Sequence, residues 1–120
     1  MARLIRRAFL ALGLGALAVS GAALAHHGWG SYDADKPLTL TGTVREPVYE
    51  NPHTGLKLET KDKTWVVVLA PPGRMRNRGL TAEMMAEGKM ATVYGYPHKT
   101  DAVELRAEWI LIDGTTTQLR

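Results

Sequence analysis

The chain has 120 residues, with 15 Lys and Arg against 12 Asp and Glu, and it contains no cysteine. This length is enough for one domain with one modest core, and the lack of cysteine excludes disulfides, thiolate metal sites and a cysteine nucleophile. The three surplus positive charges all lie in the first seven residues, so residues 26–120 are formally neutral. A neutral chain gives no reason to expect nucleic acid or an acidic membrane surface as a partner.

Residues 1–25 have the organisation of a cleavable signal peptide. Three arginines precede an apolar run over residues 8–19, and small residues follow as far as Ala25. With Ala23 and Ala25 in the two small pockets of a signal peptidase, cleavage is expected between Ala25 and His26. The apolar run is shorter than the ~20 residues that a membrane span needs. We therefore expect a periplasmic or secreted protein, exported by the general secretory or the twin-arginine route.

The rest of the chain shows short strands separated by turns. A polar arm over residues 26–37 comes first, and a domain over residues 38–120 is predicted to follow it. Alternating or β-branched segments predict five strands, and the segment 81–87 ahead of Gly88 predicts a short helix between the third and fourth. The predicted strands cover residues 38–44, 56–60, 64–69, 90–96 and 102–112.

This order of elements predicts a mainly β fold, a small five-stranded OB-like antiparallel barrel with one short helix between strands three and four. Gly42, inside the first strand, fits the sharp bend that such a barrel needs there. Trp65 and Trp109 alternate with apolar neighbours and are expected in the core. The alternative is another small antiparallel sheet with a helix, such as a half-open roll.

The four histidines are the candidate functional residues of the chain. His26 and His27 would begin the mature chain, while His53 and His98 fall in predicted turns. In an OB-fold the loops after strands one and four flank the usual binding mouth. The arm of 12 residues between His26 and Leu38 reaches up to ~40 Å when extended, so it can return to the same mouth. We expect all four histidines to meet there.

An N-terminal histidine offers its α-amino and ring nitrogens to one metal ion together, and a second imidazole completes a brace. Nitrogen ligands of this kind suit copper first and zinc second. The sequence therefore predicts a copper site at His26, His27, His53 and His98. Each histidine also has a simpler interpretation, as part of a solvated tail for the first two and as a turn residue for the others.

A transition-metal carrier, a sequestering protein or a factor that delivers metal to another exported protein is the predicted function. No residue is assigned a catalytic role. One alternative is a copper-dependent oxidase that uses the N-terminal histidine brace. The other is a metal-free OB-like module that binds a small ligand or a partner protein.

Several motifs together resemble a known family. They are the His26–Trp29 segment after an Ala-ending signal, the Leu38–Val44 strand with its glycine, Asn51-Pro52-His53, and Gly95-Tyr96-Pro97. The chain resembles a family of small secreted bacterial proteins known as domain of unknown function 6152. That family often has Trp where this chain has Tyr49. The resemblance implies export and a barrel-like β fold, and it supplies no activity.

Overall fold

The computed structural model describes residues 28–120. The predicted signal peptide and two of the predicted ligands, His26 and His27, lie outside the described residues. The described residues divide between two units, with the boundary between Ser31 and Tyr32. In the described part of the first unit, the short 3-10 helix η3 covers Trp29–Ser31. All other elements within residues 28–120 belong to the second unit.

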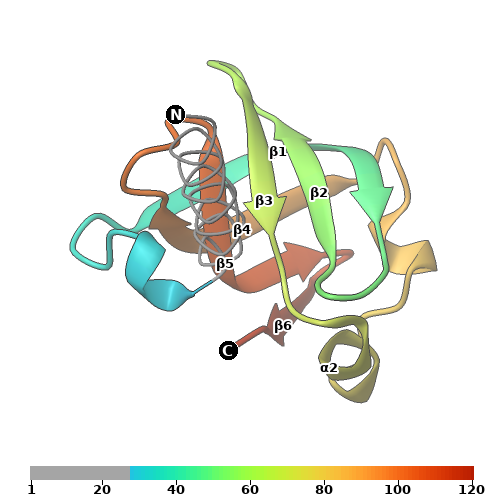
Figure 1. Cartoon of the computed structure of the whole chain (residues 1–120). Helices are drawn as coiled ribbons and strands as arrows, with labels where there is room; N and C mark the ends of the chain where they lie inside the picture. The colour runs from blue at the N-terminus through green and yellow to red at the C-terminus, as the bar shows by residue number, and fades with distance from the viewer. Residues whose placement is uncertain (1–27) are drawn as a thin grey trace, which may run out of the picture. The chain divides into compact units, whose positions relative to one another are not determined.

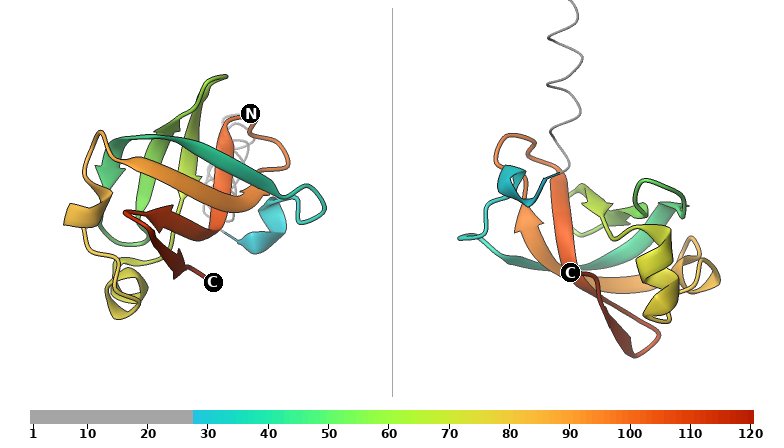
Figure 2. Two further views of the ribbon diagram at one scale, coloured as in Figure 1. Left: turned by 180° about the vertical axis from the view of Figure 1, so that it is seen from behind. Right: turned by 60° about the horizontal axis from the view of Figure 1, so that its bottom comes forward.

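The second unit is built on one six-stranded sheet that closes on itself (Figures 1 and 2). The strand order is β3-β2-β1-β4-β5-β6, and an additional pairing between β3 and β5 closes a barrel of five strands. The mainly β, OB-like barrel is therefore confirmed. The strands are β1 (Leu38–Val48), β2 (Gly55–Glu59), β3 (Thr64–Val68), β4 (Met90–Pro97), β5 (Glu104–Ile112) and β6 (Thr115–Gln118).

The barrel is mixed, whereas the sequence analysis expected it to be antiparallel. Four neighbouring pairs are antiparallel, but β3 and β5 run parallel, with Val66 opposite Glu104 and Val68 opposite Arg106. The reason is the odd number of strands in the barrel. In a closed ring of five strands, four antiparallel steps bring the last strand back in the direction of the first, so the closing pair must be parallel.

Strand β1 serves both halves of the barrel. It pairs with β4 from Leu38 to Thr43 and with β2 from Thr43 onward. Gly42 lies at the point where the partner changes, and a Cβ there would overlap the backbone carbonyl of Glu59. Gly42 was expected at a sharp bend, and what the structure shows there is a close approach of two backbones that leaves no room for a Cβ.

The helix between β3 and β4 is confirmed, but its predicted position is wrong. The α-helix α2 covers Pro72–Asn77, and the segment 81–87 contains only the 3-10 helix η4 at Glu83–Met85. The consecutive prolines at 71 and 72 follow the third predicted strand, where proline is typical of a strand end. Proline also suits the first turn of a helix, since its missing N–H has no partner there, and this second property decides the local structure.

Strand β6 was not predicted. Ile112 pairs with Thr115, so only Asp113 and Gly114 form the turn, and both have positive φ, 51° and 75°. Two residues with positive φ are what a type I′ hairpin turn requires, and Asp-Gly is a preferred pair for it. The signal was therefore present in the sequence, in the Asp-Gly pair that follows the fifth predicted strand.

The core fills the barrel and extends under the helices. It includes Trp65, as expected, together with Met75 and Met85 from the connection between β3 and β4. Trp109 was expected in the core as well, but it is only half-buried and stacks on Tyr94 with ring centroids 5.7 Å apart. Across residues 28–120, no helix has the length and apolar character needed to cross a membrane.

Candidate functional site

His98 is held inside the loop between β4 and β5. Its side chain is only 6% exposed. The backbone N–H groups of Thr100 and Asp101 both donate to its Nδ1, at 3.1 and 3.0 Å. Its own backbone N–H donates to the carbonyl of Glu104, which ties the loop to the start of β5. His98 thus organises the backbone of the loop in which it lies.

These contacts determine the tautomer of His98. Because Nδ1 accepts from two backbone N–H groups, the proton of the neutral ring must be on Nε2. Nε2 faces the carboxylate of Glu104, 3.9 Å away. A neutral imidazole that binds a metal ion through Nε2 carries its proton on Nδ1. In His98, Nδ1 cannot carry that proton unless the two hydrogen bonds from the loop backbone are broken. The geometry therefore favours a structural role for His98 over that of a metal ligand.

Tyr32 anchors the chain segment just ahead of β1 to this loop. It forms an isolated β-bridge with His98, and the two rings meet edge to face at 5.2 Å. The Tyr32 hydroxyl donates to Glu104 Oε2 at 2.6 Å. Burial, followed by this hydrogen bond, raises the pKa of Tyr32 above its ordinary value, so the hydroxyl remains a donor. Tyr32, His98 and Glu104 form one interlocked structural cluster.

His53 lies in the turn between β1 and β2. The Asn51–Pro52 peptide bond before it is cis. Thr54 after it is fixed by backbone hydrogen bonds to Ala70 and Leu69, at 2.9 and 2.8 Å. The turn predicted for this segment is confirmed. His53 borders a shallow groove of about 290 Å3 on the outer face of β2 and β3, whose lining includes Glu46, Val48, Gly55, Lys57, Val66 and Val68.

His53 and His98 were predicted to meet at one mouth of the barrel, but the structure does not bring them together. The start of β1, at Leu38, pairs with the last part of β4, so the loop with His98 lies near that end. The turn with His53 follows the other end of β1, beyond Val48. Figures 1 and 2 show the two connections apart in every view. Within residues 28–120 there is also no group of three or more potential ligands that could hold a metal ion.

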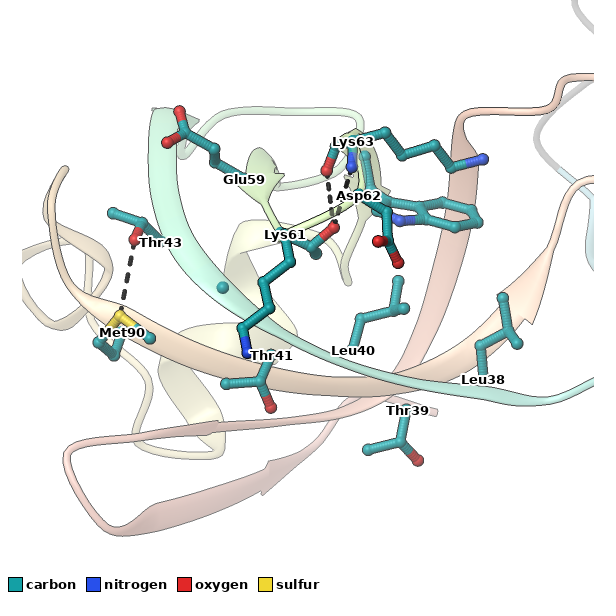
Figure 3. Close-up of a pocket in the computed structure, with 13 residues that line it drawn as sticks. Leu38, Thr39, Leu40, Thr41, Thr43, Glu59, Lys61, Asp62, Lys63 and Met90 are labelled. Carbon is teal, nitrogen blue, oxygen red and sulfur yellow. Dashed lines mark hydrogen bonds between the residues drawn. The ribbon is translucent and has the colours of Figure 1, made fainter.

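A larger groove, of about 760 Å3, lies between the first half of β1 and the β2–β3 hairpin (Figure 3). Its apolar lining includes Leu38 and Leu40, which are half-buried and pack against the core, and Trp65, which is 8% exposed. Figure 3 shows both leucines on the hairpin side of β1 and Thr39 and Thr41 on the opposite side. This alternation places an apolar surface within the groove.

Charged residues at the hairpin tip form the rim of this groove. Lys63 is already engaged, since its Nζ lies 4.0 Å from the Trp65 ring centroid and donates to the Ala102 carbonyl. Lys61 and Asp62 form no ion pair among the described residues, and Figure 3 shows both extending from the hairpin toward β1. An apolar groove of several hundred Å3 with a few polar groups at its edge is the usual form of a small-ligand site.

This groove was not predicted from the sequence. Its signal was the Leu-Thr-Leu-Thr pattern at the start of the first strand, which was interpreted only as the alternation of a half-buried strand. Leu38 and Leu40 do face inward, but the hairpin opposite them ends in charged residues that do not fill the space. Whether an inward position is covered depends on the partner strand, and the pattern of one strand does not contain that information.

The fold defines a class, a small OB-like β-barrel. The chain belongs to a family of unknown function (DUF6152), whose model matches residues 15–105. The resemblance found in the sequence is thereby confirmed. No match was found among the curated proteins.

Solved structures share the fold over part of their length. A TiaS–tRNA–ATP complex aligns with a TM-score of 0.50 and 24% identity, covering 68% of this chain and 19% of that chain. Apo TiaS, a tRNA agmatidine synthetase, aligns with a TM-score of 0.49 and 24% identity, covering 67% and 18%. The matched region thus spans about a fifth of TiaS. At this identity the likeness concerns the fold alone.

Proposed function

We propose that the protein is an exported binding module that holds a small amphipathic ligand in the groove between β1 and the β2–β3 hairpin. The single observation that supports this most is the apolar groove itself, with Leu38, Leu40 and Trp65 in its lining and charged groups at its rim. The ligand's apolar part lies on the leucines, and its polar end lies near Lys61 and Asp62. The OB-like barrel serves as a rigid frame for this surface.

The expected binding free energies indicate that the apolar part and the polar end of the ligand both contribute to its affinity. Fully burying a leucine is worth about 1.5–3 kcal/mol, and Leu38 and Leu40 are already half-buried. If a ligand covers the exposed remainder of both leucine side chains, it gains on the order of 2 kcal/mol of binding free energy. This is well short of what micromolar binding requires. The polar end must therefore contribute, through Lys61, Asp62 or both.

Three ligands that share one chain and differ in their head test this proposal: decanol, decanoate and decylammonium. In calorimetric titrations all three are expected to bind, and Leu38→Ser is expected to weaken each by about tenfold because the chain loses its apolar contact. Lys61→Gln should weaken decanoate alone, and Asp62→Asn decylammonium alone.

The matched control for Leu38→Ser is Val48→Ser, which changes an exposed valine on the other groove and should leave all three affinities unchanged. If none of the three ligands binds, or if Leu38→Ser and Val48→Ser behave alike, the proposed groove is not the binding site.

We also propose a narrower form of the copper hypothesis, in which the mature amino terminus binds the ion through His26 and His27. The expected cleavage after Ala25 supports it, since cleavage frees the α-amine of His26. The structural role of His98 and the separate position of His53 argue for leaving these two out. In this form the protein would carry, sequester or deliver copper, with zinc as the second choice.

Copper titration of the processed protein tests the narrower hypothesis. We expect one stoichiometric Cu(II) site tighter than micromolar, lost when a tag precedes His26 because the tag removes the free amine. His98→Asn should retain the site. A site that survives the tag but disappears in His98→Asn would restore the original loop-histidine hypothesis and contradict the narrower one.

A further inference from the structure

The tip of the β2–β3 hairpin is a tight turn closed by three hydrogen bonds. The backbone N–H and the hydroxyl of Thr60 both donate to the carbonyl of Lys63, at 3.0 and 2.7 Å. The backbone N–H of Lys63 donates in return to the Thr60 hydroxyl oxygen at 3.3 Å. Lys61 and Asp62 are the two central residues of this turn. Their side chains therefore extend from a backbone that is already fixed.

The other charged groups in the lining of the groove between β1 and the hairpin have partners. Glu59 pairs with Arg45, with 3.5 Å between Oε2 and Nε. Lys63 is engaged by its contacts with the indole ring and a backbone carbonyl. Lys61 and Asp62 form no ion pair, with each other or with any other residue in the described part of the chain. The groove thus has one unpaired positive and one unpaired negative charge at its rim.

Both unpaired charges lie on the groove side of the hairpin. Figure 3 shows the two side chains directed from the tip toward β1, that of Lys61 toward Thr41 and that of Asp62 toward Leu40. The Cα atoms of adjacent residues are about 3.8 Å apart, so one compact head group can contact both side chains. A ligand whose apolar chain lies on Leu40 brings its head to this pair of charges.

From this arrangement we infer that the ligand of the groove is a single-chain amphiphile with a zwitterionic head. The inference rests on the function proposed above and names the class of ligand. A head with one charge is attracted by one of the two rim residues and repelled by the other, so its net electrostatic gain is small. A zwitterionic head sets an opposite charge against each of them. The groove volume of about 760 Å3 suits one chain and its head.

Two kinds of lipid carry such a head, and two decyl compounds represent them. Decylphosphocholine has its phosphate next to the chain, as in a lysophospholipid, and its ammonium group at the end. Decyl betaine has the ammonium group next to the chain and a carboxylate at the end. The relative affinity of the two compounds therefore assigns the source, a phospholipid head or a carboxylate–ammonium head.

Calorimetric titration of both compounds below their micelle concentrations, beside decanol, tests the inference. We expect the preferred zwitterion to bind about tenfold more tightly than decanol, decanoate or decylammonium. Lys61→Gln and Asp62→Asn should each weaken its binding by about threefold, and the double variant should bind it no better than decanol. Neither side chain takes part in the hydrogen bonds that close the turn, so the hairpin should stay intact.

Lys57→Gln is the control with the same change of charge, since Lys57 pairs with Glu46 at the other groove and should not affect these affinities. If decanol binds and Leu38→Ser weakens it, but neither zwitterion binds more tightly than decanol, the inference is wrong and the proposed function stands. A double variant that binds the zwitterion as tightly as the native protein also overturns the inference. If no decyl compound binds, the proposed function fails and the inference fails with it.

Discussion

Gly95→Ala is expected to destabilise the fold strongly. Gly95 lies on β4 opposite Ala107 of β5, where the register of the two strands shifts. A Cβ at this position would overlap the carbonyl oxygen of Arg106 and lie within 2.8 Å of the Ala107 Cα. Both atoms are backbone, so neither can move aside without breaking the β4–β5 pairing. We expect a loss of about 3 kcal/mol or more, a large share of the stability of so small a domain.

Gly73→Ala is the matched control for this substitution. Gly73 lies in α2, and a Cβ there meets no atom within 4 Å. Alanine is the better helix former, so this variant should be as stable as the native protein or slightly more stable. The two variants can be compared by urea unfolding followed by circular dichroism. Equal midpoints for Gly95→Ala and Gly73→Ala would show that the close approach of β4 and β5 does not exist.

His98→Ala is expected to lower the free energy of unfolding by about 2 kcal/mol in metal-free buffer. The substitution removes the acceptor of the Thr100 and Asp101 N–H groups and the ring that packs against Tyr32. His53→Ala should change stability by less than about 0.5 kcal/mol, because His53 is partly exposed in a turn. The contrast follows from the different burial of two residues that look alike in the sequence.

His98→Asn distinguishes a structural role from ligation. The Oδ1 atom of asparagine occupies nearly the position of Nδ1 and accepts the same two N–H groups, so part of the lost stability should return. Asparagine is a poor ligand for copper, so a metal ligand would not be rescued in this way. If His98→Ala is as stable as the native protein without metal but no longer binds copper, the structural assignment of His98 is wrong.

Local patterns in the sequence were enough to predict the order of the strands and most of their bounds. The alternation in each strand and the turn residues between them depend on neighbouring positions, which is why the segments 56–60, 64–69 and 90–96 agree closely with β2, β3 and β4. Strand β1 begins at the predicted residue but extends beyond the predicted end at 44, to Val48. Gly42 was also identified correctly, since a glycine inside a strand pattern often marks a bend or a close approach of two backbones. The mispredicted helix shows where local patterns are ambiguous, because two consecutive prolines can either end a strand or begin a helix.

Other features depend on contacts between residues that are distant in the chain, and only the tertiary structure shows them. The parallel closure of β3 on β5, the separation of His53 from His98, and the space above Leu38 and Leu40 all depend on which strands lie opposite one another. A histidine in a turn has the same sequence whether its ring faces solvent, a metal or two backbone N–H groups. Only the fold around it determines which of its nitrogens is free to act.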